Sequence, residues 1–221
     1  MNVTETIRQR YSVRGFRPDP VPESIIREVI DVARLAPSAS NTQPWHVAVV
    51  SGEARRRLQA AILEEIDAGK APYPGFPPGG AGLQGDYKRR QYACAFGYYG
   101  TMGIARDDLD ARRVLGRKNW EFFGAPHAAF LSMPGTMNRG NALDVGIFMQ
   151  SIMLLFAERG IGCCPQGALA HYPDPVRAVA SIPEGNVILC GLSFGYEAPG
   201  ERINQVRMPR EALDTVASFV S

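Results

Sequence analysis

Hydrophobic residues recur at helical spacing in several long stretches of the chain. Apolar positions three or four residues apart, with charge on the other face, predict helices over residues 23–36 and 53–67. A helix over 141–159 is apolar almost all round, which indicates burial in a core or at a subunit interface. Shorter patterns predict further helices over residues 4–10 (with Thr4 as N-cap), 88–102, 107–122, 173–182 and from about 209 onward.

Three apolar runs, at residues 45–50, 127–133 and 186–195, predict strands. The first two are of the buried type, which is apolar on both faces of a sheet. Helices and strands interleave without an internal repeat, and a chain of 221 residues suits one full-sized domain. We therefore expect a single α+β or mixed α/β layered domain over residues 1–221.

The segment at residues 69–87 breaks this pattern with the sequence GKAPYPGFPPGGAGLQGDY. Its glycines and prolines exclude a regular element, and a loop of this length in a compact domain is usually a lid, a binding loop or disordered. Tyr73, Phe76 and Tyr87 give the segment side chains with which to pack, so we favour a lid.

Composition and charge exclude several classes of protein. The formal net charge is only +2, so the chain lacks the broad basic stripe expected of a nucleic-acid binder, and the basic triplets at 55–57 and 88–90 are interpreted as solvated helix faces. Residues 1–20 lack the apolar core of a secretory signal. The longest apolar run is interrupted by Asp144 and Gln150 and is too short to span a bilayer comfortably. We expect a cytoplasmic protein with no nucleic-acid or membrane partner.

The cysteines do not follow a metal-binding or disulfide pattern. Cys163 and Cys164 are adjacent, which fits neither a CxxC metal motif nor a relaxed disulfide between the two. Together with Cys94 and Cys190 they are expected to remain reduced thiols in the cytosol. We predict no metal site.

Positive charge is concentrated in one short stretch, IRQRYSVRGFR. It places four arginines around Ser12, namely Arg8, Arg10, Arg14 and Arg17. Arginine binds phosphate oxygens in pairs through its planar fork, and a serine hydroxyl adds a neutral donor, so the stretch suits an anionic ligand. Alternatively, these arginines pair with nearby acids such as Asp19, Glu23 and Glu28.

A second polar segment, LAPSASNTQPW, follows the helix predicted at 23–36. Pro37 and Pro44 fix its backbone, and the residues between them crowd hydrogen-bonding groups together. Loops of this composition on rigid flanks often hold ligands. A turn feeding a strand would explain the prolines but not so many polar residues.

Taken together, RYSVRGF…PV and APSASNTQPWH resemble the nitroreductase family of flavin enzymes. The resemblance extends to the long apolar helix, to GIGCCPQGAL after it and to VRMPRE near the end, and NWEFFGAPHAAF is most similar to the nitrobenzoate-reductase branch. It implies a mixed, mainly antiparallel sheet flanked by helices, in an intertwined homodimer with residues 141–159 at the dimer core. Residues 68–116, where family members differ, would form a lid or insertion.

The resemblance also implies non-covalently bound FMN. Arg10 and Ser12, with Tyr11 between them, match the phosphate end of that site, and Arg14 matches the position that reaches the pyrimidine edge. Arg207 matches a second phosphate-binding arginine, although Gln205 replaces the usual basic residue two positions earlier.

The remaining matches surround the flavin ring. Pro37, Ser38 and Asn41 match positions that reach the flavin from the other subunit. The segment beside the ring corresponds to Pro165, Gln166 and Gly167, where the backbone N–H of Gln166 would face flavin N5, and Lys118 or Asn119 would supply a side chain to the pyrimidine end.

The activity implied is an FMN-dependent NAD(P)H oxidoreductase that reduces nitroaromatic compounds to nitroso and hydroxylamine products by a ping-pong, two-electron mechanism. No catalytic side chain is implied, because the cofactor carries the chemistry. No GxGxxG follows a strand, so NADPH or NADH would stack on the flavin, and the sequence does not discriminate between them. Alternatives are a quinone or activated-alkene reductase of the same family, a non-enzymatic flavin-binding protein, and a patch for polyanions.

Overall fold

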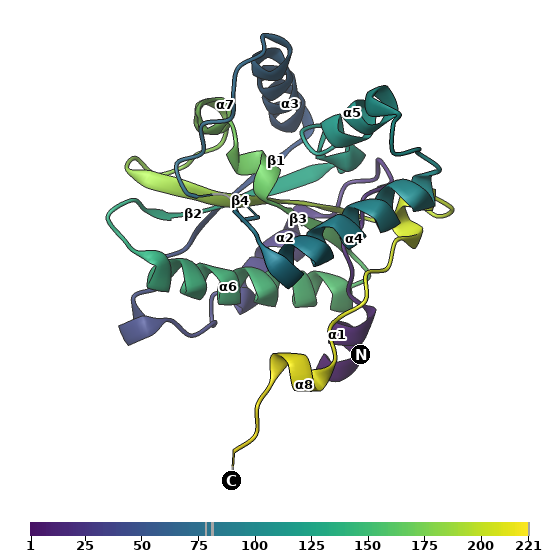
Figure 1. The fold of residues 1–221 in the computed structure, drawn as a ribbon. Coiled ribbons are helices and arrows are strands. Elements are labelled where there is room, and N and C mark those ends of the chain that lie inside the picture. Colours follow the sequence, from purple (N-terminus) through teal and green to yellow (C-terminus); the bar gives the residue numbers. More distant parts are fainter. Residues whose placement is uncertain (78, 81, 221) are drawn as a thin grey trace.

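A four-stranded antiparallel sheet forms the centre of the computed structural model, which describes residues 1–77, 79–80 and 82–220 (Figure 1). The strand order is β1-β2-β4-β3, and every neighbouring pair is antiparallel. The strands are β1 His46–Ser51, β2 His127–Pro134, β3 Gly162–Gln166 and β4 Asn186–Gly195. The three predicted strands are confirmed to within one residue, and β3 was missed.

Eight helices surround the sheet in the part of the chain that the structure describes. They are α1 Val3–Gln9, α2 Glu23–Ala33, α3 Gly52–Asp67, α4 Gly85–Met102, α5 Leu109–Arg117, α6 Arg139–Glu158, α7 Pro173–Val179 and α8 Leu213–Val216. Short 3₁₀ segments lie at η1 Ala39–Asn41, η2 Phe122–Gly124, η3 Gly167–Ala170 and η4 Arg202–Gln205.

Several predicted helix ends were wrong for identifiable reasons. Asn2, not Thr4, caps α1, because its side chain accepts from the Glu5 backbone while the Glu5 carboxylate accepts from Asn2. The helix predicted over 107–122 ends at Arg117, because the chain then bends to bury Phe122 and Phe123 in two different clusters.

The other two corrections concern proline and length. α2 ends at Ala33 rather than residue 36, and the residues before Pro37 form turns, since a residue preceding proline avoids the helical conformation. The C-terminal helix predicted from about 209 is reduced to α8, four residues long, because an isolated short segment gains too little to hold a helix.

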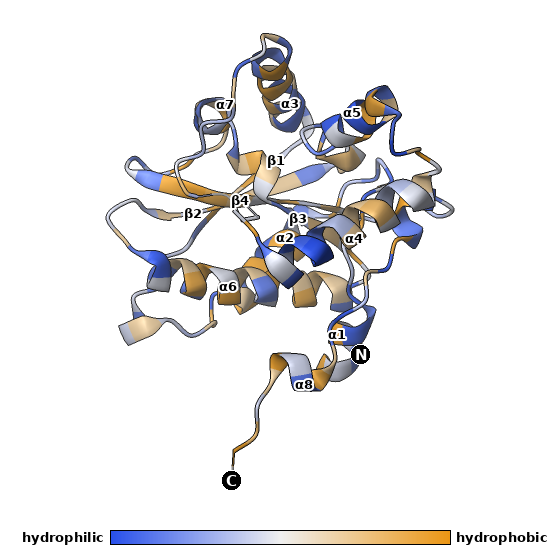
Figure 2. Cartoon of the chain, viewed as in Figure 1, coloured by the Kyte–Doolittle hydropathy of each residue, from blue (hydrophilic) through white to orange (hydrophobic). Residues whose placement is uncertain are grey.

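Helices cover both faces of the sheet, α2 and α6 on one and α3 and α7 on the other (Figure 1). β2 supplies both cores. Its Ala129, Leu131 and Met133 join the α2–α6 cluster, and the alternate residues Ala128 and Phe130 join the α3–α7 cluster. This double burial accounts for the continuous apolar run of β2, which is orange in Figure 2.

α6 packs only part of its surface within the chain. Val145, Phe148 and Phe156 are buried against α2 and the sheet, as expected for a core helix. Leu143 is 68% exposed and Ile147 is 38% exposed on another face. α6 is long and apolar enough to cross a membrane by length and composition alone, yet its buried face packs on the sheet.

β3 is a short edge strand whose sequence, GCCPQ, gives little strand signal. Pro165 is tolerated because an edge strand leaves backbone groups without a ladder partner. The chain after α1 lies along this edge, where Ser12 bridges to Cys163 and the Val13 N–H donates to the Cys163 carbonyl at 3.1 Å. Gly162 permits this approach, because a Cβ there would lie 2.7 Å from Val13 Cγ2.

The described residues between α3 and α4 contain no regular element, but the irregular segment predicted to reach residue 87 ends earlier, because α4 begins at Gly85. Tyr73 packs edge-on against Tyr172, and its hydroxyl donates to the Glu65 carboxylate. Phe76 packs at the border of the α2–α6 cluster, whereas Tyr87 belongs to α4 and is exposed. All four cysteines have free thiols in the described chain.

Candidate functional site

Arginines from the two ends of the chain meet in one pocket, with a cavity volume of about 440 Å³. It lies between the end of α1 with the segment that follows it, a side chain of α6 and the segment that follows η4. The residues that line this arginine pocket are Ile7, Arg8, Gln9, Arg10, Tyr11, Ser12, Arg14, Gln150, Val206, Arg207, Met208 and Arg210. The lining thus contains five arginines and no carboxylate.

The alternative that the N-terminal arginines pair with nearby acids holds only for Arg17. Asp19 pairs with Arg17 at 3.0 Å. The other two candidate acids are taken by other partners, since Glu23 pairs with Arg27 and Glu28 with Arg159. Within the described residues, none of the five pocket arginines forms an ion pair.

Asn204 holds the two ends of the chain together beneath this pocket. The Arg14 N–H donates to its Oδ1 at 2.8 Å, and its Nδ2 donates to the Gly15 carbonyl at 2.8 Å. Asn204 is 5% exposed, so these hydrogen bonds are shielded from water. Sequence reasoning missed this residue, which is one asparagine in an otherwise ordinary loop.

Tyr11 forms a platform for Arg207. The Arg207 guanidinium carbon lies 3.4 Å from the centroid of the Tyr11 ring, and its Nη1 donates to the Asn204 carbonyl at 2.5 Å. Burial, together with the neighbouring Glu197 carboxylate, raises the pKa of Tyr11, so the ring stays neutral. The stacking fixes the plane of the arginine fork.

A second pocket, the ring pocket, opens between α4 and η2 with a volume of about 400 Å³. Its wall consists of Arg14, Gln91, Cys94, Ala95, Tyr98, Tyr99, Leu115, Gly116, Asn119, Phe123, Val206 and Met208. It shares Arg14, Val206 and Met208 with the arginine pocket, so the two are contiguous. Asn119 lines it, whereas Lys118 does not and is exposed.

Aromatic rings surround the Arg14 side chain at the junction of the two pockets. Its guanidinium carbon lies 5.4 Å from the Tyr98 ring centroid and 5.9 Å from that of Phe123. Burial raises the pKa of Tyr98 to about 12 despite the opposing charge of Arg14. The junction therefore combines one cation with a neutral aromatic wall.

The segment 165–167 lies at the end of β3, next to the ring pocket but not in its wall. The Gln166 side chain is buried and turned inward. Its Nε2 donates to the Asn119 carbonyl at 2.8 Å, and its Oε1 accepts from the Ser193 hydroxyl. Asn119 and Ser193 therefore occupy the polar atoms of the Gln166 side chain, and its backbone lies in register with Gly191 of β4.

Residues 37–41 lie elsewhere. Figure 1 shows η1 beyond the N-terminal end of α6, at the opposite end from α1. The Ala39 N–H donates to buried Asp144 of α6 at 3.3 Å, and Ser38 Oγ accepts from the Gln43 N–H at 2.9 Å. The chain therefore does not bring Pro37, Ser38 and Asn41 to its own arginine pocket.

The backbone of the loop at residues 37–44 is strained. Ser40, Asn41 and Gln43 have φ angles of 50°, 55° and 47°. Non-glycine residues adopt this region at a cost, and such residues cluster at ligand sites and other constrained loops. The sequence predicted a rigid polar loop but not this backbone conformation.

The histidines and metal-ligand residues give no competing site. In the described residues no cluster of three His, Cys, Asp or Glu side chains could hold a metal ion. The buried His127 accepts from the Val21 N–H at 2.8 Å and contacts Ser51 Oγ at 2.5 Å. Burial lowers its pKa, and it serves as a structural link between strands and loop.

Comparison with known proteins identifies the family to which the chain belongs. The family model described as the nitroreductase family matches residues 7–196, most of the chain. The chain belongs to the nitroreductase family. The resemblance drawn from the two polar motifs is thereby confirmed.

The relatives of this nitroreductase span nearly its whole length. Nitroreductase NfnB of Mycolicibacterium smegmatis is 41% identical over 213 residues, which cover 96% of this chain and 90% of the relative. The 4-nitrobenzoate reductase of Pseudomonas putida is 34% identical over 216 residues, covering 97% and 93%.

A solved structure shares the fold. The crystal structure of the FMN-dependent nitroreductase NfnB from Mycobacterium smegmatis in complex with NADPH matches with a TM-score of 0.94 and 40% identity, over 99% of this chain and 98% of that one. The predicted α+β fold of this family, with its antiparallel sheet and flanking helices, is confirmed.

Proposed function

We propose that this nitroreductase is an FMN-dependent NAD(P)H oxidoreductase that reduces nitroaromatic compounds. The observation that carries the proposal is the arginine pocket, whose five arginines lack carboxylate partners in the described chain and which continues past Arg14 into an aromatic-walled pocket. The names of the relatives, including a 4-nitrobenzoate reductase and a structure with NADPH, support the same activity.

The residues present fit FMN. A flavin mononucleotide has a phosphate dianion at one end and a flat ring system at the other, which matches a cationic pocket joined to an aromatic one. Arg10, Ser12 and Arg207 would hold the phosphate through charge-assisted hydrogen bonds. When bound, FMN supplies the two-electron chemistry, while the protein binds and orients it.

Arg14 and Asn119 would act at the pyrimidine end of the ring. Both line the ring pocket, and Asn119 is favoured over Lys118 because Lys118 lies outside that wall. A fixed cation at Arg14 would stabilise negative charge that accumulates on the reduced cofactor. The Gln166 backbone would contact the ring's centre, since its side chain is held by Asn119 and Ser193.

The aromatic wall would select flat acceptors. Tyr98, Tyr99 and Phe123 line the ring pocket, and their faces suit stacking with a planar nitroaromatic ring. Phe122 is fully buried against Phe130 instead, so Phe123, and not its neighbour Phe122, would shape the pocket. α4, which lines this pocket, would serve as its lid within one domain.

A cytoplasmic homodimer would complete the site. Pro37, Ser38 and Asn41 do not line their own arginine pocket, and their loop contacts Asp144 of α6, which supports their reaching a partner's cofactor. A second copy would cover the exposed apolar residues of α6 and of the projecting C-terminal segment, namely Leu143, Ile147, Leu213, Val216, Phe219 and Val220.

The test is the visible absorption spectrum of the purified protein without oxygen. We expect a yellow protein that bleaches with NADPH or NADH and regains its colour with a nitroaromatic compound. A yellow protein that neither nicotinamide bleaches would indicate a flavin-binding protein without turnover. A colourless protein that takes up no FMN would contradict the proposal.

A further inference from the structure

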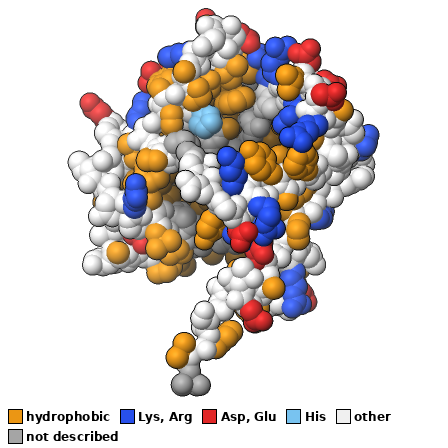
Figure 3. All heavy atoms as spheres, in the orientation of Figure 1, with side chains coloured by type: hydrophobic (Ala, Val, Ile, Leu, Met, Phe, Trp, Pro, Cys, Tyr) orange, Lys and Arg blue, Asp and Glu red, His pale blue; other side chains and the backbone are white. Residues whose placement is uncertain are grey.

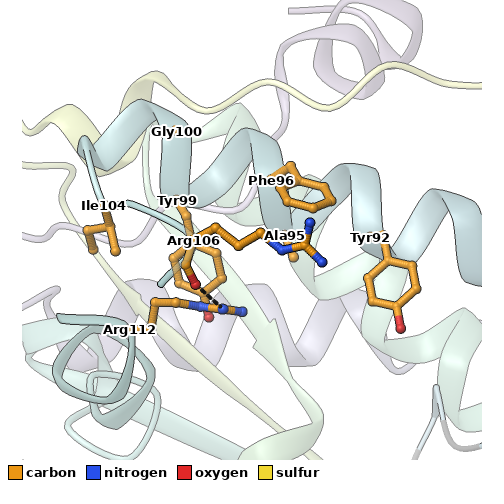
Figure 4. Close-up of a pocket in the computed structure, with 8 residues that line it drawn as sticks. All are labelled: Tyr92, Ala95, Phe96, Tyr99, Gly100, Ile104, Arg106 and Arg112. Carbon is orange, nitrogen blue, oxygen red and sulfur yellow. Dashed lines mark hydrogen bonds between the residues drawn. The ribbon is translucent and has the colours of Figure 1, made fainter. Parts of the chain in front are cut away.

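A third pocket lies on the face of α4 beside the ring pocket, and the proposed function leaves it unused. Its cavity volume is about 460 Å³, within the range of small-molecule sites. Figure 4 shows the side chains that line this α4–α5 pocket: Tyr92, Ala95, Phe96, Tyr99, Gly100, Ile104, Arg106 and Arg112. Ala95 and Tyr99 also line the ring pocket, so the two pockets adjoin across α4.

One wall is a stripe of aromatic rings. Tyr92, Phe96 and Tyr99 follow one face of α4 at spacings of four and three residues. Tyr92 and Phe96 are each 54% exposed, so the hydrophobic core does not explain them. A cation already lies over each of these rings, with Lys88 over Tyr92, so a planar ring would stack on the part of Tyr92 and Phe96 that stays exposed.

Two arginines lie over two of these rings. The Arg106 guanidinium carbon lies 5.7 Å from the Phe96 ring centroid, and that of Arg112 lies 4.6 Å from the Tyr99 centroid. Arg112 Nη1 donates to the Arg106 carbonyl at 3.0 Å, drawn as a dashed line in Figure 4. Figure 3 shows basic and hydrophobic side chains intermingled on this side of the molecule.

The charge of these arginines is not neutralised within the described chain. Neither Arg106 nor Arg112 forms an ion pair with a described residue, whereas the adjacent Arg113 pairs with Asp110 at 3.0 Å. Two guanidinium groups over a hydrophobic cavity favour an anionic group with several oxygens, and a phosphate dianion suits them better than one carboxylate.

We propose that the α4–α5 pocket binds the adenosine 2′-phosphate end of NADPH. The adenine would stack on the aromatic stripe, and the 2′-phosphate would contact Arg106 and Arg112. The inference rests on the proposed function, since a dinucleotide whose nicotinamide occupies the ring pocket reaches the α4–α5 pocket across Ala95 and Tyr99. It assigns NADPH, rather than NADH, as the preferred donor.

The direct test is calorimetric binding of adenosine 2′-monophosphate and adenosine 5′-monophosphate to the FMN-loaded, full-length protein. We expect the 2′-phosphate to bind at least about tenfold more tightly, and Arg106→Gln to remove most of that difference while Arg106→Lys restores part of it. Arg113→Gln, which removes the paired arginine next to Arg112 on α5, is the matched control and should change nothing. Equal affinities, or a difference that survives Arg106→Gln, would overturn the assignment.

Steady-state kinetics show whether the α4–α5 pocket binds the nucleotide or an anionic acceptor. Arg106→Gln should lower the ratio of kcat/KM for NADPH to that for NADH by about tenfold. If it instead raises the KM for 4-nitrobenzoate but not for nitrobenzene, with the nicotinamide ratio intact, the pocket serves the acceptor and the inference fails. Because mononucleotide binding needs no turnover, a protein that discriminates the two phosphates but reduces no nitroaromatic would count against the proposed function and in favour of this site.

Discussion

Arginines occupy two contrasting settings in this nitroreductase. On the exposed faces of helices, several arginines pair with a carboxylate three or four residues earlier, as in Arg27–Glu23, Arg34–Asp31, Arg56–Glu53 and Arg113–Asp110. In the arginine pocket, five arginines converge without such partners in the described chain. Exposed pairs contribute at most about 1 kcal/mol each, whereas an unpaired cluster gains its stabilisation from an anion.

The sequence partly predicts which arginines are paired. A paired arginine has an acid three or four residues before it. Arg10 instead has Ile7 three residues before it, and Arg14 has Arg10 four residues before it. Arg8 does follow Glu5 at that spacing, but the Glu5 carboxylate accepts the Asn2 N–H in the helix cap. Local acids therefore distinguish a solvated helix face from a ligand site only when their other hydrogen bonds are known.

The largest predicted effect is the loss of FMN affinity when an arginine of the arginine pocket is removed. Arg10→Ala should weaken FMN binding by roughly 1.5–3 kcal/mol, because charge-assisted contacts to the phosphate are lost. Arg27→Ala, which removes an exposed paired arginine, is the control and should leave FMN affinity unchanged. Fluorescence titration of the apoprotein with FMN measures both. Equal FMN affinities in the two variants would contradict the distinction between pocket arginines and paired surface arginines.

Asn204→Ala should act on stability as well as on binding. It leaves the Arg14 N–H without its partner in a buried site and removes one of the two hydrogen bonds to the Gly15 carbonyl, which still accepts from the Ala198 N–H, at a cost of about 1–3 kcal/mol of unfolding free energy. Denaturant unfolding of the apoprotein measures this. Gln205→Ala, in the neighbouring exposed position, is the control, and a similar loss in both variants would mean that Asn204 holds nothing particular.

Changing the platform under Arg207 should have a smaller effect. Tyr11→Leu removes the ring that stacks on the guanidinium and should weaken FMN binding by about 1 kcal/mol, whereas Tyr11→Phe keeps the ring and most of the affinity. The same FMN titration applies. If Tyr11→Phe loses as much as Tyr11→Leu, the hydroxyl rather than the stacking is responsible.

The smallest predicted effect concerns pH. Burial lowers the pKa of His127 below its ordinary value of 6.5, so the folded protein holds the ring neutral while the unfolded chain takes up a proton. The stabilisation is complete above about pH 6.5 and declines as the pH falls toward the lowered pKa. Unfolding free energies at pH 7.5 and 5.5 should differ less in His127→Gln than in the wild type. An unchanged difference would assign the acid sensitivity to other groups.

Much of the fold could be predicted because its elements carry strong periodic signals. β2 and α6 are apolar over long stretches, and both lie where the pattern placed them. β3 was missed because glycine, proline and two cysteines give no strand pattern, and its pairing depends on β4 and on Ser12.

The candidate site was predictable only in part. Arg10 and Arg14 are close in sequence, so their charge was visible there, whereas Arg207 was indicated only by the family resemblance and lies near them because Asn204 joins the two ends of the chain. The strained backbone of η1 left no trace beyond its polar composition. Long-range contacts and backbone strain arise from packing, which local sequence does not encode.

The central claim is that the arginine pocket holds the FMN phosphate, and comparing the affinities of FMN and riboflavin tests it most directly. Riboflavin has the same ring without the phosphate. We predict that the wild-type apoprotein binds FMN at least about a hundredfold more tightly, and that Arg10→Ala reduces this ratio by about tenfold. Equal affinities for the two flavins, or a ratio that Arg10→Ala leaves intact, would contradict the account.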